Sequence, residues 1–119
     1  MRYSDPLVKY FRNAGISNCA GFVFHELGLE PKDHYVSKKQ VKAYLLDMEI
    51  SNQPVNNYVM VIKETLHLSL IKQTNENTNV QFRNGHGINK PIQTMPLKEF
   101  LSKITLNSYS IEYRMTAQA

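Results

Sequence analysis

The stretch that decides the fold is Tyr58-Val59-Met60-Val61-Ile62, followed closely by Thr65-Leu66-His67-Leu68-Ser69-Leu70-Ile71-Lys72. The first segment is short and rich in β-branched residues, which is typical of a strand rather than a helix. The second alternates leucines with His67, Ser69 and Ile71, which is the period of two of a strand. Polar residues 74–78 then predict a hairpin loop that leads into a strand over 80–83. From residue 58 onward we therefore expect an antiparallel sheet.

Working outward from this sheet, the upstream pattern is helical. Asp5-Pro6 predicts the start of a short opening helix that ends at Gly15. Asn18 predicts the N-cap of a helix over 19–27 that ends at Gly28, and Ser37 predicts the cap of a third helix. Apolar residues recur at helical spacing in this third helix: Val41, Tyr44, Leu45 and Met48.

Downstream of the hairpin the pattern alternates between the two kinds of element. We expect a short strand over 91–94, a helix over 96–103 and a final strand over 109–115. Helices come first and an antiparallel sheet follows, so the sequence predicts an α+β fold. A length of 119 residues suits a single domain over 1–119.

The composition excludes several classes of protein. With 42% apolar and 20% charged residues, the chain is globular rather than disordered or fibrous. It has no apolar run long enough to cross a membrane and no secretory signal at its start. We therefore expect no membrane partner and a cytoplasmic location at synthesis, which leaves a specialised export route open. The net charge of +4 comes without a basic block or a known motif, so we expect no nucleic-acid partner.

The single cysteine, Cys19, excludes an intramolecular disulfide and would lie at a helix N-terminus. Unpaired N–H groups and the helix dipole there favour an anion, so a lowered thiol pKa and a nucleophilic role are expected. Iodoacetamide should then modify this thiol quickly at about pH 6, where an ordinary thiol is nearly inert. The alternative is that Cys19 is a small buried apolar residue without chemistry.

A nucleophilic thiol needs a base, and the chain offers four histidines. His25 lies on another face of the cysteine's own helix, and His34 lies in a polar loop where it is most simply solvated. His86 lies between two glycines in a turn-like segment. His67 begins a strand that a helix could pack against, with the small Ser69 beside it on the same face. We therefore expect His67 to be the base.

At these residues the chain resembles a known family. Asn18-Cys19-Ala20-Gly21-Phe22-Val23 is similar to the Asp-Cys-Ser-Gly-Phe-Val helix start of NlpC-type papain-like cysteine peptidases. The strand over 58–62 and the following Leu66-His67-Leu68-Ser69-Leu70-Ile71 resemble the strand pair that carries the family's histidine. Residues 80–87 and the Pro-Leu helix start at 96 resemble the segments that follow.

The resemblance implies a papain-like fold, with N-terminal helices packed on an antiparallel sheet. Cys19 would attack an amide or ester carbonyl and His67 would act as base and then as acid. The expected function is a small cysteine hydrolase, a peptidase or amidase that cuts a peptide or a peptidoglycan fragment. An acyltransferase or deamidase on this fold is an alternative. The sequence indicates no oligomeric state.

Several positions depart from the family's pattern. The residues that contact the substrate's amine in the family correspond to Asn18 and Ala20, and an upstream tyrosine corresponds at most to Tyr10. The residue that orients the imidazole falls near Phe82 in one alignment. Hairpin geometry instead places Asn84 opposite His67, where its amide oxygen could accept the Nδ1–H bond. Gln81 and His86 remain open for this third role.

These departures favour a rival function from another class. A catalytically inactive papain-like module would recognise a peptide or protein partner with the same fold. A metal site is not expected, because Cys19 and the histidines lack the spacing of metal ligands. No phosphate-loop or dinucleotide fingerprint is present, so no cofactor is expected.

Overall fold

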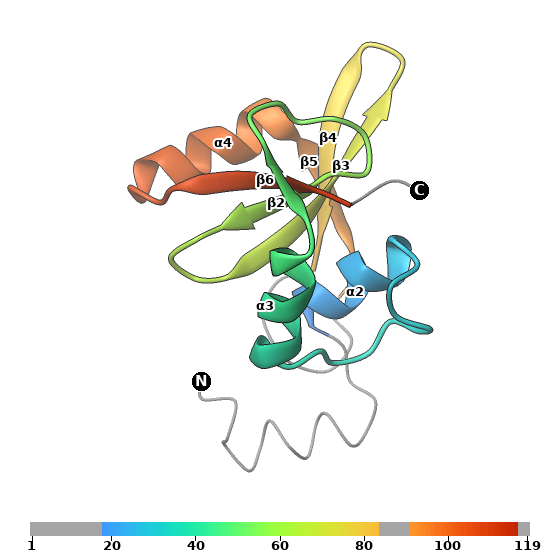
Figure 1. The fold of residues 1–119 in the computed structure, drawn as a ribbon. Coiled ribbons are helices and arrows are strands. Elements are labelled where there is room, and N and C mark those ends of the chain that lie inside the picture. Colours follow the sequence, from blue (N-terminus) through green and yellow to red (C-terminus); the bar gives the residue numbers. More distant parts are fainter. Residues whose placement is uncertain (1–17, 84–90, 117–119) are drawn as a thin grey trace.

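The computed structural model describes residues 18–83 and 91–116 (Figure 1). Within them the elements follow in the order α2 (Cys19–Glu26), α3 (Lys38–Leu46), β1 (Glu49–Ser51), β2 (Val59–Ile62), β3 (His67–Thr74), β4 (Asn77–Phe82), β5 (Gln93–Pro96), α4 (Leu97–Leu106) and β6 (Ile111–Met115). The predicted α+β class is confirmed. The opening helix expected from Asp5 lies outside the described residues.

The strands form one sheet in the order β1-β6-β2-β3-β4-β5, and all pairs are antiparallel. The predicted hairpin is present between β3 and β4, in which Leu70 pairs with Gln81 and Thr74 with Asn77. The last strand, β6, inserts between β1 and β2, so the C-terminal part of the sequence holds two earlier strands together. The short strand expected over 91–94 is shifted and occupies Gln93–Pro96 instead.

Helices cover both faces of the sheet, with α2 and α3 on one face and α4 on the other (Figure 1). Alternation along β3 sends Leu68 and Leu70 into the core beneath α2 and α3, while Ile71 lies in the core beneath α4. Because both faces are buried, the residues that alternate with the leucines of β3 are covered as well.

The two helices on the first face begin at side-chain caps. The Asn18 side chain accepts a hydrogen bond from the Gly21 N–H, and the Ser37 side chain accepts one from the Gln40 N–H. Both caps are those predicted from the sequence. No helix in the described ranges, 18–83 and 91–116, has the length and apolar character needed to span a membrane.

Candidate functional site

The start of α2 is fixed by Asn18. Its Oδ1 accepts hydrogen bonds from the backbone N–H groups of Gly21 at 2.8 Å and Val36 at 3.3 Å. Its Nδ2 donates to the Val36 carbonyl at 3.0 Å. Asn18 is 2% exposed, and so is Ala20. The expectation that these two side chains contact a substrate is therefore corrected: Asn18 acts as a buried cap, and Ala20 packs in the core.

Cys19 is the first residue of α2 and is partly buried. Burial raises the pKa of its thiol from 9.0, because it disfavours the thiolate. Backbone hydrogen bonding from Leu68, Ala20 and Cys19 itself and the charge of Arg83 oppose this effect, but they are smaller. The lowered pKa expected from the helix terminus alone is therefore wrong, because tertiary packing outweighs the local donors.

His67 is the first residue of β3 and is partly buried. Its ring lies with its centroid 6.0 Å from that of Phe82 and 6.5 Å from that of Phe100, both in edge-on arrangements. Burial lowers the pKa of the imidazole below its usual 6.5, and backbone hydrogen bonding at Arg83 opposes this shift. The imidazole is therefore neutral at neutral pH.

The structure does not join Cys19 and His67, because α2 covers one face of the sheet and the imidazole lies on the other. The thiol contacts the backbone of Leu68, the residue that follows His67. The imidazole lies instead against Phe82 and Phe100, which belong to the core beneath α4. Both ring nitrogens are buried, and neither forms a hydrogen bond of normal geometry with a described residue, although the Arg83 backbone is close enough to act on the pKa of the ring. In the described residues, the Cys19 thiol and the His67 imidazole therefore do not form the hydrogen bond of a catalytic pair.

The residues considered for the third catalytic role divide between the two faces of the sheet. Gln81 pairs with Leu70, whose side chain faces α2 and α3, so Gln81 is on the face opposite His67. Phe82 has its ring beside the imidazole, where an orienting polar group would have to lie. Asn84 and His86 lie outside the described residues, as does Tyr10, so their predicted roles stay predictions.

Sequence reasoning missed Arg83, which follows β4 and is 8% exposed. Its Nη1 lies 2.8 Å from Oδ1 of Asp33, in the segment between α2 and α3. This ion pair ties the end of the β3–β4 hairpin to the helical layer and brings positive charge near Cys19. The only signal in the sequence was a charged residue directly after a strand, which is too common to indicate a site.

A second polar cluster involves His25 and His34, of which His34 was expected to be solvated. The Glu30 carboxylate contacts Nε2 of His34 and accepts a hydrogen bond from the hydroxyl of Tyr44. His25 is exposed, with Nδ1 3.3 Å from the Glu30 carbonyl. His34 lies in a loop, as expected, but the expectation that its side chain is simply solvated is corrected, because the side chain bonds to Glu30. In the described part of the chain, no group of three or more His, Cys, Asp or Glu side chains is arranged to hold a metal.

Comparison with known proteins adds no relative. No protein-family model, curated protein or solved structure matches the chain.

Proposed function

We propose that the chain is a small cysteine hydrolase of papain-like, NlpC-type fold, a peptidase or amidase acting on a peptide or a peptidoglycan fragment. One observation carries the proposal. The Cys19 thiol lies against the backbone of Leu68, and the adjacent residue His67 has both ring nitrogens buried, with no hydrogen bond of normal geometry to a described side chain and a backbone interaction at Arg83 that is smaller than the effect of burial. A buried imidazole with so little hydrogen bonding is costly, and a catalytic role is one explanation for it.

The chemistry follows from these two groups. Cys19 Sγ attacks the carbonyl carbon of the amide while His67 takes the thiol proton. The C–N bond then breaks, and the imidazolium returns this proton to the leaving amine. Water attacks the thioester with His67 again as base, which releases the carboxylic acid and restores the thiol. N–H groups at the start of α2 would stabilise the oxyanion.

The proposal requires a local rearrangement. The thiol and imidazole are both neutral in the resting arrangement, and the ring lies against Phe82 and Phe100. To accept the thiol proton, the ring must leave these aromatic contacts and move to the other face of β3, on which Leu68 lies and which α2 covers. Catalytic hydrogen bonds are often loose before substrate binds, so substrate would complete the pair.

A catalytically inactive papain-like module that binds a peptide or protein is the second candidate. Two observations favour it: Phe82 lies where an orienting polar group is needed, and burial raises the pKa of the thiol. An enzyme and such a module differ in turnover rather than in fold.

Turnover of stem-peptide fragments, followed by mass spectrometry, tests the hydrolase. The wild-type chain should cleave an amide bond, and Cys19→Ala or His67→Ala should abolish cleavage. His25→Ala, which changes an exposed histidine, is the matched control and should retain full activity. Each variant's near-ultraviolet circular dichroism should match the wild type. Full activity of Cys19→Ala would refute the mechanism. Saturable peptide binding without cleavage, equal in Cys19→Ala and wild type, would establish the module instead.

A further inference from the structure

A hollow of about 270 Å³ lies between α3 and the paired strands β2 and β6, away from the groups used above. The residues around it are of two kinds, apolar and charged: Lys42, Leu45, Leu46, Val61, Lys63, Leu66, Glu112 and Arg114. Leu45 and Val61 are buried at 7% and 2% exposure, whereas Leu46 is 81% exposed. The hollow therefore combines a buried apolar floor with an uncovered leucine.

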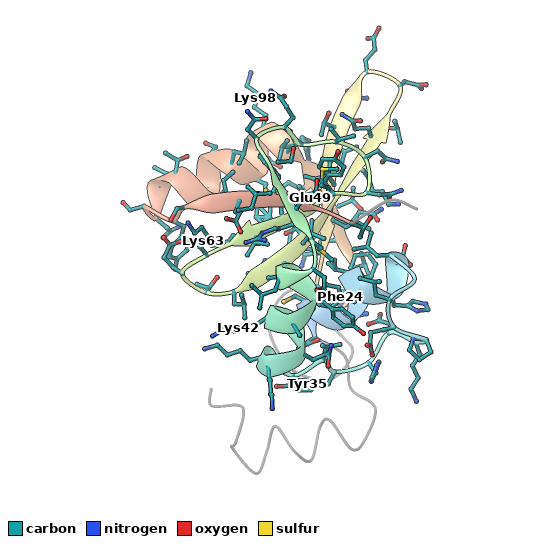
Figure 2. The ribbon with its side chains drawn as sticks, in the orientation of Figure 1. Phe24, Tyr35, Lys42, Glu49, Lys63 and Lys98 are labelled. Carbon is teal, nitrogen blue, oxygen red and sulfur yellow. The ribbon has the colours of Figure 1, made fainter. Side chains whose placement is uncertain are left out.

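The positive charge at this hollow comes from two lysines. Arg114 is already engaged, since its Nε donates to Glu112 at 2.7 Å and its Nη1 donates to the carbonyls of Leu45 and Met48. Lys42 and Lys63 are exposed, and in the described ranges neither forms an ion pair. Both extend toward the same side of the molecule (Figure 2). The carboxylate next to Lys63, that of Glu64, is held by Ser110. Two exposed cations that form no ion pair with a described residue thus lie beside an apolar floor, and the charge of Lys63 acts on the Glu64 carboxyl only as the last of the causes that lower its pKa.

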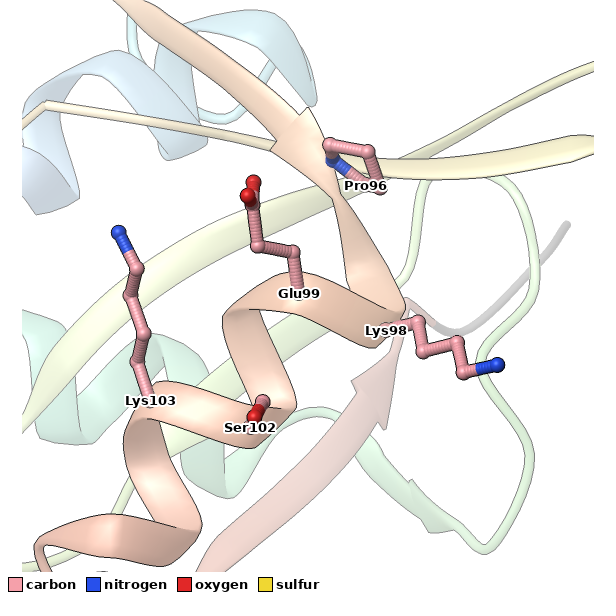
Figure 3. A pocket seen from close by; sticks show the side chains of 5 residues that line it. All are labelled: Pro96, Lys98, Glu99, Ser102 and Lys103. Carbon is pink, nitrogen blue, oxygen red and sulfur yellow. The ribbon is translucent and has the colours of Figure 1, made fainter.

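A second hollow, on α4, provides a comparison for this pairing of an apolar floor with exposed cations. It is lined by Pro96, Lys98, Glu99, Ser102 and Lys103. Figure 3 shows that Lys98 and Lys103 point away from one another, with Glu99 between them along the helix. Its charges do not converge, and it has no buried aliphatic floor.

We infer that the hollow between α3 and β2–β6 binds the carboxyl terminus of a peptide whose last residue is apolar. Lys42 and Lys63 pair with the terminal carboxylate, and Leu45, Val61 and Leu66 contact the terminal side chain. The volume of the hollow limits the size of the ligand that it can hold. Pockets for drug-sized ligands usually take roughly 300–1,000 Å³, so this smaller hollow suits one apolar side chain with its carboxylate rather than a long acyl chain. The site does not involve Cys19 and is independent of the proposed hydrolysis.

Fluorescence anisotropy with a labelled peptide ending in leucine tests the inference, using the full chain as wild type and as Cys19→Ala. Both should bind the free-acid peptide saturably and equally. The same peptide with an amidated carboxyl terminus should bind about three- to tenfold more weakly, because the two exposed ion pairs are lost. The double variant Lys42→Gln/Lys63→Gln should show a similar loss. The matched control Lys98→Gln/Lys103→Gln, on α4, should bind as the wild type does.

Three outcomes would overturn the inference. Equal binding of the acid and the amide would exclude recognition of the carboxylate. Unchanged binding by Lys42→Gln/Lys63→Gln, with circular dichroism showing a folded chain, would exclude this hollow. Binding of octanoate without binding of the peptide would assign the hollow to a fatty acid. Failure of hydrolysis with intact binding would refute only the proposed function.

Discussion

The side chain of Asn18 engages both backbone polar groups of Val36. Nδ2 donates to the Val36 carbonyl at 3.0 Å, and Oδ1 accepts from the Val36 N–H at 3.3 Å. The same Oδ1 caps α2 by accepting from the Gly21 N–H. One buried amide thereby fixes the start of the helix that carries Cys19 against a segment 18 residues later in the chain.

Replacing Asn18 by alanine should therefore lower the free energy of unfolding by about 2 kcal/mol, because it removes a helix cap and leaves buried backbone groups of Val36 without partners. Urea unfolding followed by circular dichroism measures this change. Ser37→Ala, which removes the exposed cap of α3, is the matched control and should cost about 1 kcal/mol or less. Equal effects of the two substitutions would show that the contact with Val36 contributes nothing.

Much of the fold could be predicted because it rests on local signals. Asn18 and Ser37 cap helices where the sequence indicated, and the polar residues after β3 form the expected hairpin. Strand β1, Glu49–Ser51, was not predicted. It is only three residues long and mostly exposed, and it exists through pairing with β6, in which Glu49 opposes Met115. Local pattern carries no information about so distant a partner.

The candidate site shows the same division between local and distant causes. Alternation predicted that His67 and Ser69 share a face of β3, but it could not show that Phe100 of α4 would lie over that face. For Cys19, the helix terminus predicted a lowered pKa, and the burial that raises it comes from packing against other segments. Arg83 reaches Asp33 across 50 residues, so no local pattern could have paired them.

Substituting Glu30 by glutamine should lower the pKa of Tyr44. In the wild type the Glu30 carboxylate accepts the hydrogen bond of the Tyr44 hydroxyl, and this bond raises the pKa of Tyr44 to about 12. An uncharged amide stabilises the phenol less, so the pKa should move back toward 10.0. Titration of tyrosinate absorbance measures the shift, with the Tyr44→Phe chain subtracted to remove the other tyrosines. Glu26→Gln, on α2 and away from these contacts, should leave the titration unchanged; an unchanged titration in Glu30→Gln would contradict the assignment.

Acid should destabilise the protein through His67 before it protonates carboxylates. Burial lowers the pKa of this imidazole below 6.5 in the folded state, so in the window just below pH 6.5 the unfolded chain binds a proton that the folded chain does not. The stability contributed by a neutral His67 is complete above pH 6.5 and is lost as the pH falls toward the folded pKa. Urea unfolding between about pH 5 and 7.5 should show this loss in the wild type.

The His67→Phe variant provides the comparison, since it keeps a ring against Phe82 and Phe100 but cannot titrate. Its stability should depend less on pH over the same window, whereas His25→Gln, at an exposed position, should follow the wild type. Identical pH profiles of His67→Phe and the wild type would show that the His67 imidazole is not responsible.

Alkylation of Cys19 by iodoacetamide should be slow at pH 6 to 7 and should rise only in alkaline solution, with its midpoint above 9.0, because burial raises the pKa of the thiol. The rate can be followed by mass spectrometry, since Cys19 is the one cysteine of the chain. Arg83→Gln should move the midpoint further upward, because the charge of Arg83 lowers the pKa of this thiol. Lys98→Gln, on the opposite helical layer, is the control for a general loss of positive charge and should leave the midpoint in place. Rapid alkylation at pH 6 would instead mean that the thiolate is already formed in the resting protein and that the local donors outweigh the burial of Cys19.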